Sequence, residues 1–150
     1  MTAGSQDLVQ ELRKRGVTDV DDSVLTRALY SSDASLYRVV PQLVARPRHP
    51  DELLAILDVS RSTGVPVTMR GAGTSIAGNA VGPGIVVDTL KHLNKVVSID
   101  AEARTAVVQP GVVHADLQRA EPPSHVGRSR RPRDVEVHDV VDGAAVAQCP

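Results

Sequence analysis

The residues best suited to chemistry lie in a glycine-rich run, RGAGTSIAGN, which occupies positions 70–79 and directly follows an apolar segment typical of a strand. Glycine at positions 71, 73 and 78 allows positive φ angles and close approach of a ligand, so successive backbone N–H groups can turn toward an anion. Thr74 and Ser75 add hydroxyl groups as hydrogen-bond donors. A pyrophosphate, which presents many acceptor oxygens and two negative charges, is the ligand that such a loop favours.

Two familiar phosphate loops do not fit this run. A Walker A loop ends in Gly-Lys-Ser/Thr, and the nearest lysine is Lys91. The Rossmann fingerprint needs a third glycine at position 76, which is Ile76. A tight turn between two strands is the other interpretation of Gly-x-Gly, and the adjacent Thr74 and Ser75 favour the anion site over it. Two roles stay open for Arg70, which would either lie near phosphate or pair with an acid at the sheet edge.

A parallel β-α-β unit is expected to position the loop. Residues 43–45 form a short apolar strand that Pro47 terminates, and residues 50–52 supply the proline and acids typical of a first helical turn. Gly64 would end this helix, and residues 65–69 form the second strand. The loop after that strand then lies on the ligand-facing edge of the sheet. The apolar stripe of the helix is predicted to comprise Leu53, Leu54, Ile56, Leu57 and Ser60.

Two helices are predicted before this unit. Ser5 would cap the first, Gly16 would end it, and its apolar residues Leu8, Val9 and Leu12 fall on one face. The second covers residues 22–30, and the side chains expected to face inward are those of Val24, Leu25, Ala28 and Leu29.

Further strands are predicted after the loop, at residues 85–88 and in a hairpin made by residues 96–99 and 105–108, followed by a helix over 112–120. Asp33 and Asp88 are expected to cap turns. Together these elements predict an α/β fold, without internal repeats.

Composition excludes several functional classes. The chain of 150 residues is 41% hydrophobic and 1% aromatic, with a formal net charge of −1. So few aromatic rings argue against stacking on single-stranded nucleic acid, and the net charge argues against binding of a duplex. Cys149 is the single cysteine, so no disulfide or Cys-x-x-Cys pair is expected. No metal site is predicted, because no ligand spacing is found for His49, His92 and His114.

Membrane segments are not expected either. No apolar run approaches eighteen residues, and the N-terminus lacks a basic segment followed by an apolar stretch. These patterns predict a cytoplasmic protein without a membrane span.

Four segments carry a resemblance to a known family. They are YSSDASLYR at residues 30–38, RP at 46–47, MRGAGTSIAGNAVG at 69–82 and VQPGV at 108–112. Collinear over about residues 25–120, they resemble the FAD-linked oxidase family with a PCMH-type (vanillyl-alcohol-oxidase type) FAD-binding domain. Within it, the chain is most similar to the D-lactate dehydrogenase and glycolate oxidase group.

The resemblance implies a fold and a site. Residues 40–120 would be the first subdomain of the FAD-binding α/β (α+β) domain, and residues 1–39 an N-terminal helical segment. The implied FAD-binding residues are Arg70, Gly71, Ala72, Gly73, Thr74, Ser75, Gly78, Asn79, Pro110 and Gly111. Some relatives attach FAD through a histidine in the glycine loop. Because no histidine lies between His49 and His92, bound FAD would be non-covalent.

The reaction that the resemblance implies is hydride transfer from the carbinol carbon of a 2-hydroxy acid, such as D-lactate or glycolate, to FAD. The acid/base residues of the family would lie beyond the matching segments, so no catalytic residue is named and negligible turnover is expected from this chain alone. The alternatives are a non-catalytic nucleotide-binding or subunit-interaction module, working beside a partner chain that supplies the missing domains, and an inactive truncated product.

Residues 121–150 depart from the family. They contain no Leu, Ile or aromatic residue, and a solvated disordered segment is expected. Residues 134–142 can be back-translated with codons that end in C or G and then translated again one base later. The peptide obtained in this way resembles the family's next flavin-binding stretch. This predicts that residues from about 121 onward are an out-of-frame tail on a truncated flavoprotein.

Overall fold

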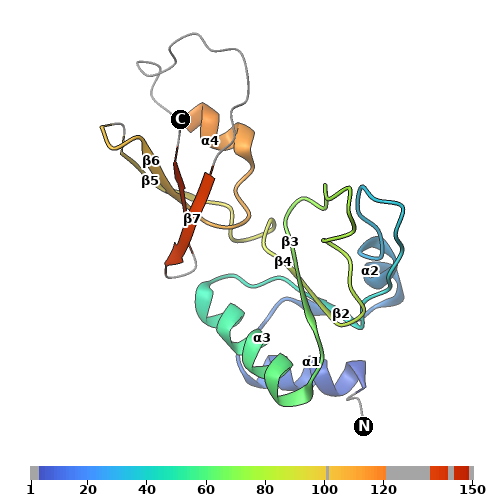
Figure 1. The fold of residues 1–150 in the computed structure, drawn as a ribbon. Coiled ribbons are helices and arrows are strands. Elements are labelled where there is room, and N and C mark those ends of the chain that lie inside the picture. The colour runs from blue at the N-terminus through green and yellow to red at the C-terminus, as the bar shows by residue number, and fades with distance from the viewer. Residues whose placement is uncertain (1–3, 101, 121–135, 142–143, 149–150) are drawn as a thin grey trace. The chain divides into compact units, whose positions relative to one another are not determined.

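The computed structural model describes residues 4–100, 102–120, 136–141 and 144–148. The chain divides into two compact units, Met1–His92 and Leu93–Pro150 (Figure 1). Helices and sheets are mixed along the chain, which confirms the predicted α/β (α+β) class. In the described part of the chain, no helix is long and apolar enough to cross a membrane.

The first unit contains a four-stranded sheet with the order β1-β2-β4-β3. Its strands are β1 (Val20–Asp21), β2 (Leu43–Ala45), β3 (Val67–Arg70) and β4 (Ile85–Asp88). Both β2 and β3 run parallel to β4, and β1 runs antiparallel to β2. The predicted parallel arrangement is therefore confirmed, but β4 lies between the two strands of the β-α-β unit.

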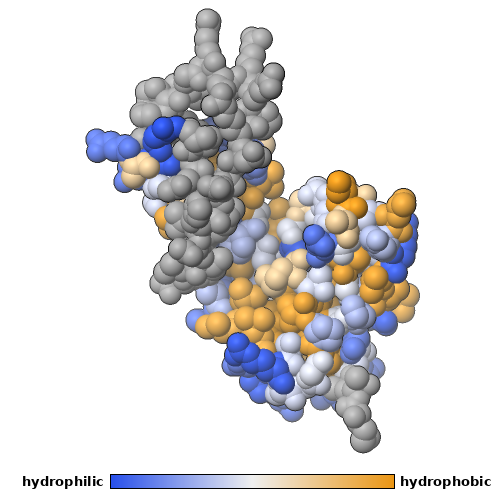
Figure 2. All heavy atoms as spheres, in the orientation of Figure 1, coloured by the Kyte–Doolittle hydropathy of each residue, from blue (hydrophilic) through white to orange (hydrophobic). Residues whose placement is uncertain are grey.

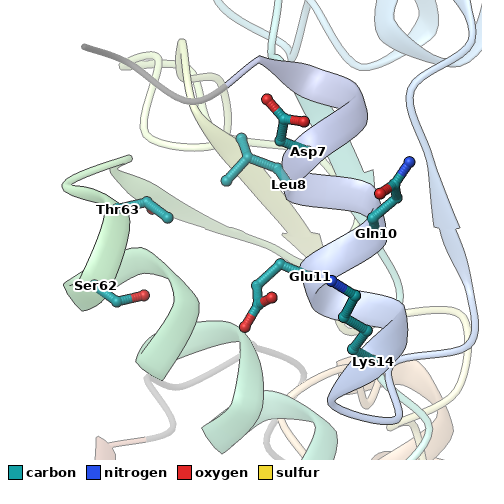
Figure 3. Close-up of a pocket in the computed structure, with 7 residues that line it drawn as sticks. All are labelled: Asp7, Leu8, Gln10, Glu11, Lys14, Ser62 and Thr63. Carbon is teal, nitrogen blue, oxygen red and sulfur yellow. The ribbon is translucent and has the colours of Figure 1, made fainter.

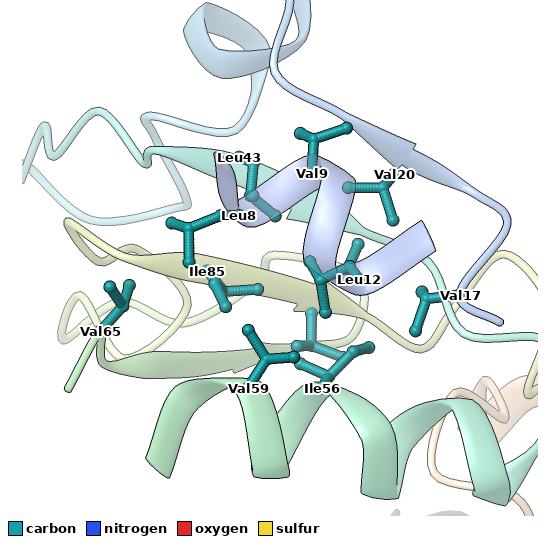
Figure 4. Close-up of a cluster of buried hydrophobic side chains, with 12 residues drawn as sticks. Leu8, Val9, Leu12, Val17, Val20, Leu43, Ile56, Val59, Val65 and Ile85 are labelled. Carbon is teal, nitrogen blue, oxygen red and sulfur yellow. The ribbon is translucent and has the colours of Figure 1, made fainter. Parts of the chain in front are cut away.

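Helices α1 (Ser5–Lys14) and α3 (Pro50–Thr63) pack against this sheet and bury its core (Figure 4). Leu8 and Leu12 of α1 and Ile56 of α3 meet Leu43 and Ile85 of the strands in one buried cluster. This burial removes aliphatic surface from water and is the main stabilising contribution to the unit.

Two details of these helices differ from expectation. Gly4, not Ser5, is the N-cap residue of α1, and no side chain caps the helix. In α3 the buried face includes Val59 and Glu52, while Leu54 is exposed. The carboxylate of Glu52 accepts a hydrogen bond from the backbone N–H of Arg48 (3.1 Å), which fixes a polar side chain on the inner face of the first turn.

Helix α2 (Val24–Leu29) has the opposite orientation from the one predicted. The four side chains expected to face inward, Val24, Leu25, Ala28 and Leu29, are exposed, and Thr26 is buried instead. Hydrogen bonds set this orientation, because the Thr26 hydroxyl donates to Asp21 (2.6 Å) and Arg27 donates to the carbonyl of Pro41 (2.7 Å). Apolar surface is accordingly visible on the first unit in Figure 2.

The second unit contains a sheet with the order β5-β6-β8-β7. Strands β5 (Val96–Asp100) and β6 (Thr105–Val108) form the predicted hairpin, and α4 (His114–Ala120) follows. Strands β7 (Glu136–Val141) and β8 (Ala144–Gln148) lie where the sequence predicted a disordered segment. Val137, Val140 and Val141 of β7 are β-branched residues, which are typical of strands. Residues 121–135 lie outside the described part of the chain.

Candidate functional site

The glycine-rich run begins at the last residue of β3, at the carboxyl ends of the parallel strands β2, β4 and β3. This is the edge of an open parallel sheet where ligands bind. Gly71, Ala72, Thr74 and Asn79 are exposed there. A Cβ atom built on Gly71 would meet no atom within 4 Å, so the backbone at this position faces open space that a ligand can enter.

Gly73 and Gly78 have the positive φ angles that the sequence predicted, 69° and 78°, whereas Gly71 does not. Both positions are also closely packed. A Cβ on Gly73 would lie 2.7 Å from Cζ of Arg70, and one on Gly78 would lie 2.6 Å from Cδ2 of Tyr37. The positive φ angles therefore favour glycine at positions 73 and 78, and a side chain at either position would displace Arg70 or Tyr37.

Ser75 organises the second half of the loop. Its Oγ accepts hydrogen bonds from the backbone N–H groups of Ala77 (3.3 Å) and Asn79 (3.0 Å). Because the hydroxyl acts as an acceptor in both bonds, its own hydrogen is available to an acceptor outside the loop. The geometry at Ser75 is thus compatible with the predicted contact to an anion.

Arg70 is bound to the backbone. Its Nη1 donates to the carbonyl oxygens of Ser32 and Ala80, each at 3.0 Å, and its guanidinium lies over the ring of Tyr30, with Cζ 5.1 Å from the ring centroid. Of the two roles left open for Arg70, pairing with an acid at the sheet edge is not the arrangement in the described residues. A contact to phosphate stays a prediction.

Three side chains form a row across the ends of the parallel strands. Arg70 of β3 is opposite Asp88 of β4, and Arg46 directly follows Ala45, whose partner is Val87. Tyr30 lies over this row: its hydroxyl donates to Asp88, and Cζ of Arg46 is 5.3 Å from its ring centroid. Burial and the hydrogen bond to Asp88 raise the pKa of Tyr30, so the phenol stays neutral at physiological pH.

Sequence reasoning did not assign roles to Tyr30 and Arg46. Both lie within the segments that carry the family resemblance, and Arg46 directly follows a strand, which is the available signal that it lies at the sheet edge. Their contact with Arg70 comes from strand order and register, which the sequence pattern does not give.

Asp33 and Asp88 have the turn-capping role that was predicted. Asp33 accepts from the backbone N–H of Ser35 (2.9 Å) and of Ala80 (3.3 Å), so it joins the segment after α2 to the end of the loop. The hydroxyl of Ser35 is the main cause of the lowered pKa of Asp33. Asp88 accepts from the N–H groups of Leu90 (2.8 Å) and Lys91 (3.3 Å).

Pro110 and Gly111, the remaining predicted contacts, belong to the second unit. They follow β6, and the N–H of Gly111 donates to the carbonyl of Leu93 (2.7 Å). A contact of Pro110 and Gly111 with FAD stays a prediction.

A groove of about 340 Å³ lies elsewhere on the first unit, between α1 and the last turn of α3 (Figure 3). Its lining includes Asp7, Glu11 and Lys14 of α1 and Ser62 and Thr63 of α3. None of the predicted FAD-binding residues lines this groove. Within the described ranges, no group of three His, Cys, Asp or Glu side chains is arranged to hold a metal ion.

Comparison with known proteins identifies the family. The family model described as an FAD binding domain matches residues 41–123. The glycolate oxidase subunit GlcD of Bacillus subtilis (strain 168) is 39% identical over 113 residues, which are 74% of this chain and 24% of that protein. The D-2-hydroxyglutarate dehydrogenase of Escherichia coli (strain K12) is 32% identical over 117 residues, which are 75% of this chain and 12% of that protein. The chain thus spans a quarter or less of the length of these relatives.

Solved structures support the same assignment. An alkyldihydroxyacetonephosphate synthase has a TM-score of 0.67 at 22% identity, and the match covers 79% of this chain and 25% of the synthase, which shows a shared fold. A variant of berberine bridge enzyme has a TM-score of 0.62 at 27% identity, with 76% of this chain and 25% of the enzyme covered. The predicted resemblance to FAD-linked oxidases is confirmed, and the chain belongs to the FAD binding domain family.

Proposed function

We propose that this chain binds FAD non-covalently through residues 70–79 and is the FAD-binding part of a flavin-dependent oxidoreductase. Its substrate would be a 2-hydroxy acid such as D-lactate or glycolate, oxidised by hydride transfer to the flavin. The names of the two relatives support this class, because glycolate and D-2-hydroxyglutarate are both 2-hydroxy acids.

The observation that carries the proposal is the open backbone at Gly71, at the carboxyl edge of the parallel sheet. A pyrophosphate can approach the main chain there without meeting a side chain. Thr74 and Ser75 would add hydroxyl donors, while Gly73 and Gly78 hold the turns that aim the backbone. Bound FAD would supply the hydride acceptor, and the contribution of these residues is to hold the cofactor and fix its orientation.

Non-covalent binding is proposed because the run contains no histidine, cysteine or other side chain typical of flavin attachment. The nearest histidine after the run, His92, lies beside Asp19, with Nε2 and Oδ2 2.9 Å apart. Denaturation of FAD-loaded protein, followed by filtration, tests this proposal: all of the flavin should pass the filter.

The substitution Gly71→Val tests the site. Because the added side chain meets open space and Gly71 has no positive φ angle, the chain should keep its fold while the cofactor is excluded. Gly4→Ser is the control, since Gly4 also has room for a Cβ atom, lies outside the loop and is the N-cap of α1, a position that serine favours. We expect purified wild-type chain and the control to bind one equivalent of FAD, and Gly71→Val to bind none. Equal binding by all three proteins would show that the loop does not hold FAD.

Turnover requires a separate measurement. We propose that this chain alone has negligible activity, because it covers 24% and 12% of the two relatives and a substrate-binding region would come from additional sequence or from a partner chain. Dye reduction with D-lactate, glycolate or D-2-hydroxyglutarate should stay at background, and substrate-dependent reduction would contradict this.

Two sequence-based predictions accompany the proposal. The first is that residues from about 121 onward are translated out of frame. Sequencing the coding DNA tests this, because the family's sequence should continue there in another reading frame. Location in the cytoplasm stays a prediction and is tested by fractionation of the source cells.

A further inference from the structure

We infer that Arg70 and Tyr30 are positioning residues that set the shape of the glycine loop and, through that shape, its affinity for FAD. The part of this inference that concerns affinity rests on the proposed function. The part that concerns loop shape rests on contacts within the first unit and can be tested without cofactor.

Arg70 joins two segments that are distant in sequence. Through one nitrogen atom it binds the carbonyl of Ser32, which follows α2, and that of Ala80, which ends the loop. The same two segments are joined by two further hydrogen bonds, from the N–H of Ala34 to the carbonyl of Gly73 (3.1 Å) and from the N–H of Ala80 to the carboxylate of Asp33 (3.3 Å). Arg70, at the start of the loop, thus binds both the segment after α2 and the residue that follows the loop.

The guanidinium also fixes the middle of the loop. A Cβ on Gly73 would collide with Nη2 and Cζ of Arg70, so the backbone of Gly73 lies directly against the guanidinium group. With its positive φ angle, Gly73 turns the chain at this contact. A flat, delocalised cation provides such a surface, whereas the compact ammonium group of lysine does not.

Tyr30 holds Arg70 in place. Two guanidiniums contact its ring, with Cζ of Arg70 at 5.1 Å and Cζ of Arg46 at 5.3 Å from the centroid. Its hydroxyl is bound to Asp88, which is the β4 residue opposite Arg70 in the sheet. Strand register, the ring contact and two carbonyl acceptors together hold Arg70 against the loop.

The substitutions Arg70→Lys and Arg46→Lys form a matched pair. Both keep the positive charge and both remove a guanidinium from the ring of Tyr30, but Arg46 makes no hydrogen bond to the loop; it binds Asp19 and Tyr30. Amide hydrogen exchange by NMR on the apoprotein measures loop order at Ala34 and Ala80, with Ile85, which donates to Pro66 (2.9 Å), as the sheet reference.

We expect Arg70→Lys to accelerate exchange at Ala34 and Ala80 about tenfold, a loss of about 1.4 kcal/mol and within the range of a desolvated cation–π contact. Exchange at Ile85 should not change, and Arg46→Lys should leave all three amides unaffected. The inference would be overturned if the loop amides of Arg70→Lys exchanged as in the wild type. It would also be overturned if exchange accelerated equally in Arg70→Lys and Arg46→Lys.

A second pair, Tyr30→Phe and Tyr30→Leu, decides the matter if Arg70→Lys does not fold. Phenylalanine keeps the ring and loses the hydroxyl, so it should preserve slow exchange at Ala34 and Ala80 even if the loss of the bond to Asp88 lowers overall stability. Leucine should accelerate exchange at both amides. Identical exchange in these two variants would refute the role of the ring.

FAD titration of the same proteins separates this inference from the proposed function. If the wild-type chain binds FAD, Arg70→Lys and Tyr30→Leu should raise the Kd about tenfold, while Arg46→Lys and Tyr30→Phe should not. If the wild-type chain binds no FAD, the proposed function fails for this chain, and the exchange measurements still confirm or refute the role of Arg70 and Tyr30 in loop shape. Altered loop exchange with an unchanged Kd would overturn the part concerning affinity.

Discussion

Replacing Asp19 with asparagine removes a charge that three cationic or basic side chains share. The carboxylate lies 3.1 Å from Nη1 of Arg46, 2.8 Å from Nζ of Lys91 and 2.9 Å from Nε2 of His92. These contacts connect the residue before β1 to the residue after β2 and to the turn after β4. Because these contacts hold three separate parts of the first unit together, we expect Asp19→Asn to lower the stability of this unit.

The size of the effect follows from burial. Removing one partner of a buried ion pair costs about 3–5 kcal/mol, whereas an exposed pair contributes below about 1 kcal/mol. The side chains of Asp19 and Arg46 are 15% and 12% exposed, but that of Lys91 is 52% exposed. The contact of Asp19 with Arg46 is thus nearly buried, and that with Lys91 is screened by water. We therefore expect Asp19→Asn to lower the free energy of unfolding by about 2–3 kcal/mol.

The same contacts make the effect dependent on pH. Burial acts to raise the pKa of Asp19, but hydrogen bonds from Lys91, His92 and Arg46 outweigh it and hold the pKa well below its ordinary value of 3.8. A carboxyl group with a lowered pKa in the folded state stabilises the protein fully above the ordinary pKa, and this stabilisation is lost as pH falls toward the folded-state value. The difference between wild type and Asp19→Asn should therefore be constant near neutral pH and shrink below about pH 4.

Urea unfolding followed by far-ultraviolet circular dichroism measures this difference at pH 7 and pH 3. Asp58→Asn is the control, because Asp58 and Arg61 are 3.6 Å apart and their side chains are 58% and 79% exposed. It should change the free energy of unfolding by less than about 0.5 kcal/mol. A loss for Asp19→Asn no larger than that of the control at pH 7, or a loss that grows on acidification, would refute the reasoning.

Further substitutions test the core, a helix end and a turn. Ile56→Ala should lower the free energy of unfolding by about 3–4 kcal/mol, since Ile56 is fully buried, whereas exposed Leu54→Ala should cost less than about 0.5 kcal/mol; urea unfolding compares them. Gly64→Ala should lower the free energy of unfolding by about 1 kcal/mol in the same assay, because Gly64 ends α3 at a φ of 71°, which is unfavourable for alanine. The added Cβ atom itself would meet no atom within 4 Å. Thr26→Val should raise the pKa of Asp21, measured by NMR titration, because the Thr26 hydroxyl is the main cause of its lowered pKa.

Local sequence signals predicted most elements of the first unit. Short apolar runs bounded by Pro47, Gly64 and the glycine run correspond to β2, α3 and β3. The orientation of α2 could not be predicted in this way. A helix of six residues with several apolar positions has no single apolar face, and the hydrogen bonds of Thr26 and Arg27 to distant residues decide which side is buried.

The candidate site was predicted in part for a similar reason. Gly73, Gly78 and Ser75 act within the loop, so their spacing in the sequence indicates their roles. Tyr30 and Arg46 act from 24 or more positions before the loop. The sequence could not place them because their contacts depend on β4 lying between β2 and β3, and hydrophobic periodicity does not determine strand order.

Strand order also explains why the glycine pattern alone is a weak predictor of a nucleotide site. The same residues between other strands would lack Arg46 and Asp88 beside Arg70 and the ring of Tyr30 next to its guanidinium, so these contacts would no longer hold that guanidinium against Gly73. A positive φ angle makes a turn accessible, but contacts from outside the turn select one conformation among those that glycine allows. The affinity of such a loop for a pyrophosphate therefore depends on the residues that immobilise it as much as on the glycines that let the ligand approach.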